Sequence, residues 1–119
     1  MGKFTFRKEE RLKKELWIKE LFAKGSSFHL YPFRVLQLPH PLPGAPHNQV
    51  LFSVSARNFK KAVDRNTIKR RMREAYRLNK HQLSGNQKWL IAYIYTSREM
   101  EPSVLIHEKM IQTLKRVAR

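Results

Sequence analysis

The stretch DRNTIKRRMREAYRLN, residues 64–79, combines a helical hydrophobic pattern with a high density of positive charge. At 100° per residue, the apolar side chains gather on one side of a helix, at Ile68, Met72, Ala75 and Tyr76, together with Asn79. The adjoining arc carries polar and basic residues, which are Asn66, Lys69, Arg70, Arg73 and Arg77. The pattern predicts a helix with one side in the core and a basic side next to it.

The charge of this region is too large to be neutralised within the helix. Between Arg57 and Lys80 there are ten basic and two acidic residues, so i,i+4 pairs leave most of the charge uncompensated. The plain structural interpretation is a solvated face whose arginine stems cover apolar surface. Because arginine donates two parallel hydrogen bonds to phosphate, we favour a nucleic-acid partner.

Length and composition limit the kind of protein. A chain of 119 residues fits one domain, residues 1–119, and its 41% hydrophobic content is enough for a globular core. The net charge of +16 attracts polyanions, with nucleic acid the first candidate and an anionic membrane surface the second. No apolar run could span a membrane and no signal peptide is visible, so we expect a cytoplasmic protein. The absence of cysteine excludes disulfides and thiolate chemistry.

The N-terminal part of the chain predicts a short helix. The segment KELWIKELFAKG, residues 14–25, has Ile18, Leu21 and Phe22 on one face and Trp17 at the edge of that face. Gly25 is a typical residue to end such a helix.

Strands are predicted on both sides of a proline-rich loop. Two runs rich in β-branched and aromatic residues, 28–37 and 50–55, flank the loop LPHPLPGAPH at 38–47. We expect these two runs to pair with each other as antiparallel strands.

The C-terminal part predicts a buried strand and a closing helix. The segment KWLIAYIYT, residues 88–96, is apolar on both alternating faces, as in a central strand that is covered on both sides. Residues 103–118 follow Pro102 and carry an apolar stripe at Ile106, Met110, Ile111, Leu114 and Val117. The order helix, two or three strands, helix, strand, helix implies an α+β sandwich with a small mixed sheet.

The amino-acid sequence of the basic region resembles that of a known family. The signature of the bacterial ribonuclease P protein component resembles residues 52–80, FSVSARNFKKAVDRNTIKRRMREAYRLNK. In the family, an F-S-V-S-like strand and a K-K-x loop precede the pattern R-N-R-x-K-R-x-x-R-E. RLKKELWIKELFAKG, residues 11–25, resembles the family's N-terminal segment, and WLIAYIY with the helix after it resembles its end. The likeness covers nearly the whole chain.

Three positions depart from the family pattern. Thr67 stands at the third position of the R-N-R triplet and removes a positive charge there. Ile18 occupies a position that is usually aromatic, and Ala56 followed by Arg57 stands where the family has two lysines.

The resemblance implies a specific fold and activity. The fold is a two-layer α+β sandwich, a small mixed sheet with about three helices and a left-handed β-α-β crossover, like the second domain of ribosomal protein S5. The enzyme removes the 5′ leader from precursor tRNA, and its RNA subunit carries the catalytic centre and the Mg²⁺ ions. The protein subunit would bind no cofactor by itself, and its partners would be the ribonuclease P RNA and precursor tRNA, with neither a membrane nor DNA.

The resemblance also implies two binding sites on opposite faces of an adaptor. The residues expected to contact RNA are Arg57, Lys60, Lys61, Arg65, Asn66, Lys69, Arg70, Arg73 and Arg77. A cleft between the first helix and the sheet would hold the single-stranded leader, because unpaired bases can lie on aromatic faces while cations follow the backbone. Its expected residues are Trp17, Ile18, Phe22, Phe33 and Val54.

The sequence shows no catalytic constellation or metal site of its own. A protein nuclease would need an acid/base pair or carboxylates that hold a metal ion, whereas most acidic residues fall at predicted helix edges or in turns. Asp64 is better explained as the N-cap of the basic helix. The five histidines share no metal-ligand spacing, and Ser53 and Ser55 have no partner histidine and aspartate beside them.

Two other functions compete with this interpretation. A small basic RNA-binding protein of the ribosomal type, without a processing role, would share the charge but would not need an apolar groove on the sheet. A metal-dependent nuclease would need clustered carboxylates, which the sequence does not provide.

Overall fold

The computed structural model describes residues 6–83 and 85–117. Its helices and strands, with two short 3-10 helices, follow the chain in the order η1 (Lys8–Glu10), α1 (Glu15–Lys24), β1 (Ser26–Leu30), β2 (Phe33–Pro39), β3 (Gln49–Val54), α2 (Ala62–Asn79), η2 (Lys80–Leu83), β4 (Trp89–Tyr95) and α3 (Ser103–Val117). The predicted α+β fold with three α-helices and a small mixed sheet is confirmed. None of the described helices is both long and apolar enough to cross a membrane.

The four strands lie in the order β1-β2-β4-β3. β1 pairs with β2 and β2 with β4 as antiparallel neighbours, whereas β3 and β4 are parallel. The expected antiparallel pairing of 28–37 with 50–55 is therefore wrong. The first of these runs forms its own hairpin, and β4, which is apolar on both faces, takes the central place between β2 and β3, where both of its faces are covered except near Ile94.

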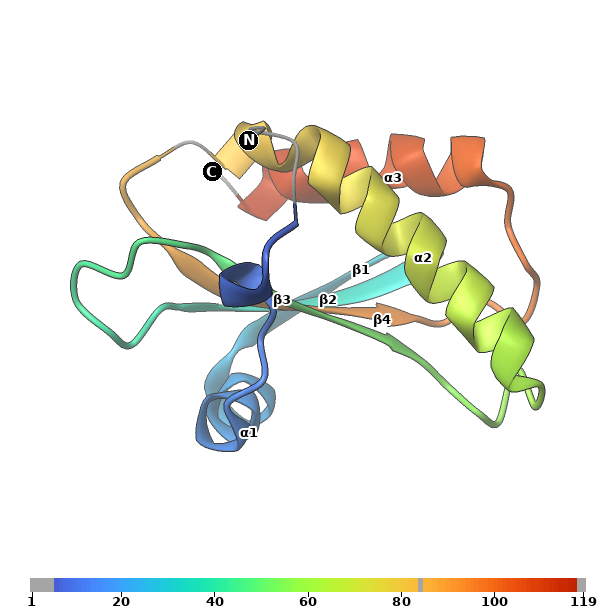
Figure 1. Ribbon diagram of the computed structural model, residues 1–119, viewed down its shortest axis with the longest axis horizontal. Coiled ribbons are helices and arrows are strands. Elements are labelled where there is room, and N and C mark those ends of the chain that lie inside the picture. Colours follow the sequence, from blue (N-terminus) through green and yellow to red (C-terminus); the bar gives the residue numbers. More distant parts are fainter. Residues whose placement is uncertain (1–5, 84, 118–119) are drawn as a thin grey trace.

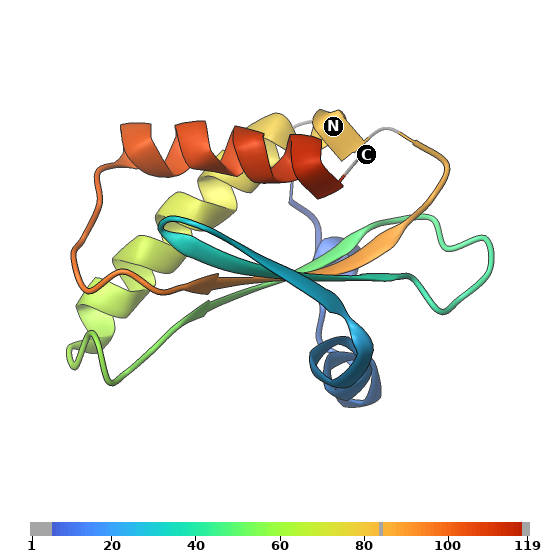
Figure 2. The ribbon, with the colours of Figure 1, turned by 180° about the vertical axis from the view of Figure 1, so that it is seen from behind.

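The connection from β3 through α2 to β4 is a left-handed crossover. In Figure 1 the chain follows β3 towards the right, returns above the sheet in α2, and re-enters the sheet as β4 on the side of β3 away from the viewer. Figure 2 shows the same path from behind. Nearly all parallel crossovers are right-handed, so this hand is a distinctive property of the fold.

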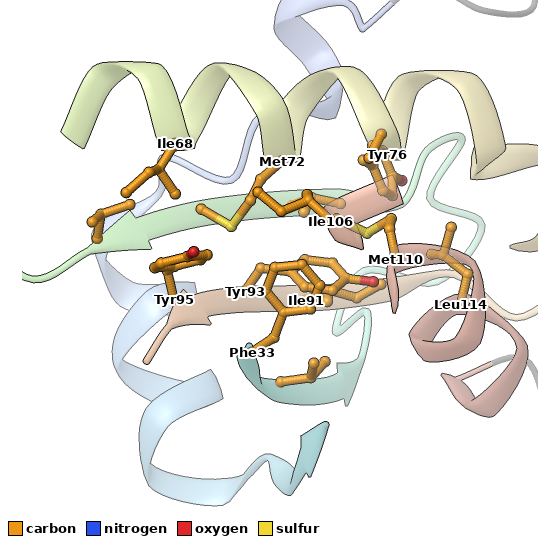
Figure 3. Packing of buried hydrophobic residues seen from close by; sticks show 14 of the residues in the cluster. Phe33, Ile68, Met72, Tyr76, Ile91, Tyr93, Tyr95, Ile106, Met110 and Leu114 are labelled. Carbon is orange, nitrogen blue, oxygen red and sulfur yellow. The ribbon is translucent and has the colours of Figure 1, made fainter. Parts of the chain in front are cut away.

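The sheet has different partners on its two faces. α2 and α3 cover one face and enclose the main core, whereas α1 lies against the other face and covers only part of it (Figure 1). Figure 3 shows side chains of α2 and α3 pointing at the aromatic residues of the strands, among them Phe33, Tyr93 and Tyr95. The two-layer core thus belongs to the sheet, α2 and α3.

The predicted orientation of α2 is confirmed. Its buried residues are those of the predicted apolar arc, which are Ile68, Met72, Ala75, Tyr76 and Asn79. This burial turns the adjoining basic arc of α2 away from the core.

One predicted helix boundary differs from the structure. Asp64 is not the N-cap of α2, because the helix begins at Ala62 and Lys61 occupies the cap position without a side-chain cap bond. Asp64 lies in the first turn, where its negative charge is favourable at the positive end of the helix dipole. The closing helix, predicted over 103–118, is described as far as Val117, and residue 118 lies outside the described residues.

Candidate nucleic-acid interface

The first candidate surface is the basic face of α2, defined by Asn66, Lys69, Arg70 and Arg73. Asn66 and Arg70 are exposed, and Lys69 and Arg73 are half-buried. Across residues 6–83 and 85–117, the three cations have no carboxylate within ion-pair distance. Their charge is therefore available to an external anion, and arginine is suited to phosphate.

Arg65 has a different role from its neighbours on α2. Its Nη1 donates to the carbonyl oxygens of Phe59 at 2.7 Å and Lys60 at 2.9 Å. The guanidinium thus ties the loop after β3 to the first turn of α2. This loop carries the exposed Arg57, Lys60 and Lys61, so Arg65 orders the part of the chain that presents these cations.

We expect Arg65→Lys to destabilise the protein by about 1 to 2 kcal/mol, because an ammonium cannot reproduce two hydrogen bonds from a planar fork. Urea denaturation measures the loss. The control is Asn66→Ala, an exposed neighbour on the same helix, which should leave stability nearly unchanged. An Arg65→Lys variant as stable as the parent protein would show that the two bonds do not hold the loop.

Two further residues of α2 are engaged within the helix itself. Arg77 forms an ion pair with Glu74, and this hydrogen bond lowers the pKa of the Glu74 carboxyl. Thr67 donates its hydroxyl to the carbonyl oxygen of Val63 at 2.9 Å, so its side chain folds back on the helix. Arg77 consequently offers less free charge than the basic face, and Thr67 offers no substitute for the family's arginine.

The second candidate surface is the α1 side of the sheet. α1 covers Leu36, Leu90 and Ala92, which are buried beneath it. The next residues towards the C-terminal ends of β3 and β4 are less covered: Ile94 and its neighbour Ser53 are half-buried, and Arg34 on the other side of Ile94 is exposed. In Figure 1, no helix lies below this right-hand part of the sheet.

Phe22 and Ile18 face this uncovered area from α1. With Leu21 buried against the sheet, a helical wheel places Ile18 about 60° and Phe22 about 100° to one side of it. Trp17 falls about 40° to the other side, where its ring lies 4.8 Å from that of His40, just after β2. The side chain of Phe22 is 48% exposed, so its ring is free to contact a ligand. Ile94, Ser53 and Arg34 form an incompletely covered part of the sheet beside Phe22 and Ile18, and we name this area the α1 cleft after the cleft that the family resemblance implies.

The expected cleft residues Phe33 and Val54 do not belong to this surface. Successive side chains of a strand point to opposite faces, and both residues point into the main core on the α2/α3 side. Phe33 is fully buried, 5.6 Å from Tyr93 between ring centroids, and Val54 is 7% exposed. Their expected place in the cleft is wrong, and Trp17 lies on the far flank of α1. Arg34 and Ser53, each one residue away in sequence, face the cleft instead, and strict alternation along the strands would have indicated them.

Among the residues that the structure describes, no three His, Asp or Glu side chains come together as a possible metal site.

These features define a class of protein. A mixed α+β fold that carries an uncompensated basic helix on one side and, on the other, an incompletely covered sheet face beside an exposed aromatic ring has the form of a small RNA-binding protein.

The chain belongs to the ribonuclease P protein family. The family model "Ribonuclease P" matches residues 6–118. The ribonuclease P protein component of Porphyromonas gingivalis is 35% identical over 120 residues, covering 97% of this chain and 88% of the relative. That of a Picosynechococcus species is 36% identical over 110 residues, covering 92% and 88%. Membership makes the chain a protein subunit of ribonuclease P and implies a partnership with the RNA of that enzyme.

Solved structures share the fold. The RNase P protein of Staphylococcus aureus superposes with a TM-score of 0.75 at 23% identity, covering 92% of this chain and 95% of that chain. The protein from Thermotoga maritima gives 0.73 at 24% identity, covering 90% and 96%.

Proposed function

We propose that this chain binds the ribonuclease P RNA through the basic face of α2 and holds the 5′ leader of precursor tRNA in the α1 cleft. It thereby assists the endonucleolytic removal of the leader, which leaves the mature 5′ end of the tRNA. The observation that carries this proposal is the separation of the two surfaces. The basic face lies on the α2 side of the sheet and the cleft lies on the α1 side.

The basic face suits a folded RNA. Lys69, Arg70 and Arg73 project from consecutive turns of one rigid helix, and their counter-charge must come from outside the described part of the chain. RNA that docks there releases counterions from its phosphates, which favours binding and makes it dependent on salt.

The α1 cleft suits a single strand. Phe22 supplies an exposed ring on which an unpaired base can stack, and Ile94 continues the apolar surface on the sheet. The exposed Arg34 next to Ile94 can follow the phosphates of the strand. In a double helix the faces of the bases are stacked on one another and cannot lie on an exposed ring, so the single-stranded leader is the part of the substrate that fits.

In this proposal the catalytic centre and its Mg²⁺ ions belong to the RNA subunit. The protein supplies cations that reduce the repulsion between crowded phosphates, so that less Mg²⁺ is required for assembly and cleavage. The expected cytoplasmic location and the absence of a DNA partner stay predictions.

Reconstitution tests the proposed function. We expect the purified protein alone to leave precursor tRNA intact, and a bacterial ribonuclease P RNA to cleave it at a lower Mg²⁺ concentration when the protein is added. Gel analysis of the 5′ end measures both results. Cleavage by RNA-free protein would contradict the proposal, and so would a protein that binds the RNA without lowering the Mg²⁺ requirement, as expected of a ribosomal-type binder.

A further inference from the structure

A small groove lies at the free edge of β3, between the N-terminal segment and α2. Its apolar lining comes from Phe6, Leu12, Val50, Leu51 and Phe52, and its basic lining from Arg11, Lys13, Lys69 and Arg73. We call it the edge groove. Its volume is about 200 Å3, below the roughly 300 to 1,000 Å3 of pockets for drug-sized ligands. The size suits one planar base rather than a larger ligand.

The edge of β3 is only partly paired. The N-terminal segment passes in front of β3 in Figure 1, and its described part, from Phe6 on, forms one bridge to this strand, between Arg11 and Val50. There the backbone N–H of Leu12 donates to the carbonyl oxygen of Val50 at 3.0 Å. No other described segment adds a strand at this edge. An edge of this kind presents unpaired N–H and C=O groups, which can hydrogen-bond the edge of a base.

Two aromatic rings are held firmly at the groove. Phe52 stacks on Tyr93 at 5.8 Å, and Phe6 lies edge-on against Phe52 at 5.9 Å and Tyr76 at 5.7 Å. Both phenylalanines are nevertheless only half-buried. A fixed ring with an accessible side is what base stacking requires.

The charge of the groove favours RNA over a peptide. Arg11 and Lys13 lie on the N-terminal side and Lys69 and Arg73 on the α2 side, and within 6–83 and 85–117 no carboxylate lies at ion-pair distance from any of the four. A peptide strand could also add to the β3 edge, but it would leave these cations without a partner. The two phosphates that flank a bound base would instead give each pair of cations, on the N-terminal side and on the α2 side, an anionic partner.

We propose that the edge groove binds one unpaired nucleotide of the ribonuclease P RNA. Its base lies against Phe6 and Phe52, and the flanking phosphates contact Lys69 with Arg73 on one side and Arg11 with Lys13 on the other. This inference rests on the proposed function and adds a base-reading site to it. Phosphate contacts on the basic face position the protein, whereas a base contact selects a particular point on the RNA.

Cross-linking locates the nucleotide. The chain contains no cysteine, so Lys13→Cys introduces a single thiol that can carry a photoreactive aryl azide. With a bacterial ribonuclease P RNA and no precursor tRNA, we expect cross-links at one unpaired nucleotide or its immediate neighbours. Lys115→Cys, at an exposed position in the last turn of α3, is the control and should not reach that nucleotide. Cross-links only after precursor tRNA is added would assign the groove to the substrate and overturn the proposal.

Removing the base tests whether the groove reads it. An RNA made abasic at the cross-linked nucleotide should bind the wild-type protein about 5- to 100-fold more weakly. For Phe6→Leu this penalty should be clearly smaller, because one of the two rings against which the base lies is absent. Phe28→Leu is the matched control: Phe28 is also half-buried, and Arg116 lies over its ring as Arg11 lies over that of Phe6. It should keep the full penalty.

Each outcome has a distinct meaning. Melting curves confirm that both leucine variants are folded. An equal penalty in Phe6→Leu and in the wild type, or no penalty in the wild type, would overturn the edge groove as a base site while protein-assisted cleavage still supported the proposed function. A protein that neither binds the RNA nor assists cleavage would overturn the proposed function itself.

Discussion

Phe33→Ala is expected to lower the free energy of unfolding by about 3 to 5 kcal/mol. The ring is completely buried beside Tyr93 and Tyr95 (Figure 3), so its removal deletes apolar contacts and leaves a cavity. For a domain of this size the melting temperature should fall by roughly 10 to 20 °C. Thermal denaturation followed by circular dichroism measures the change, and every binding activity should decline together with the folded fraction.

Phe22→Ala is the matched control, because it makes the same substitution at a ring that is 48% exposed. Its stability should change by less than about 1 kcal/mol. We expect the holoenzyme to bind precursor tRNA about 5- to 100-fold more weakly, as the loss of one base stack implies, and to bind mature tRNA as before. Equal losses for the two ligands would remove Phe22 from the leader site. A Phe33→Ala variant with an unchanged melting temperature but weaker binding of precursor tRNA would show that Phe33 does belong to the leader site.

Replacing Lys69, Arg70 and Arg73 together by alanine is expected to weaken binding to the ribonuclease P RNA and to flatten its salt dependence. Each phosphate contact adds about 0.9 to the slope of log affinity against log salt. If all three cations contact phosphate, a fourfold rise in salt should reduce wild-type affinity roughly 40-fold more than that of the variant. Filter binding over a salt series measures the slope.

The control for the triple variant removes the same charge elsewhere. Lys19, Lys24 and Lys115 are exposed and lie on α1 and α3. Their replacement by alanine should change the slope little. An equal decrease in both variants would mean that total charge, and not the basic face, binds the RNA. Loss of helical signal in the first variant would mean that the basic face contributes to folding.

The basic helix could be predicted from residues 64–79 alone because helical structure depends on neighbours three and four positions apart. The apolar spacing of Ile68, Met72 and Tyr76 determined which side of α2 is buried, and the basic residues on the adjoining arc were then directed to solvent. The same local logic correctly indicated α1, α3 and the central position of β4. The role of Arg65 was not predictable, since its contacts depend on the conformation of the loop at Phe59 and Lys60.

The partners of the strands were decided only by the tertiary structure. Residues 28–37 and 50–55 have the composition of strands, but strand pairing joins positions that are far apart in the sequence, and composition does not specify which pairs form. The left-handed crossover places β3 beside β4 and leaves its other edge free for the N-terminal segment. For this reason the edge groove has no signature in the sequence, since Phe6, Phe52 and Arg73 come together only when the sheet is complete.

At the α1 cleft, too, some residues could be predicted from the sequence and others only from the tertiary structure. The family resemblance implied that aromatic residues on the first helix and the sheet bind unpaired bases, and it pointed to Phe22, whose exposed ring suits that role. It could not determine which face of the sheet Phe33 would occupy. A change of one position along a strand moves a side chain to the opposite face, and the large core under α2 and α3 buries more apolar surface than the small contact with α1. The tertiary structure therefore placed Phe33 in the core and left Arg34 to face the cleft.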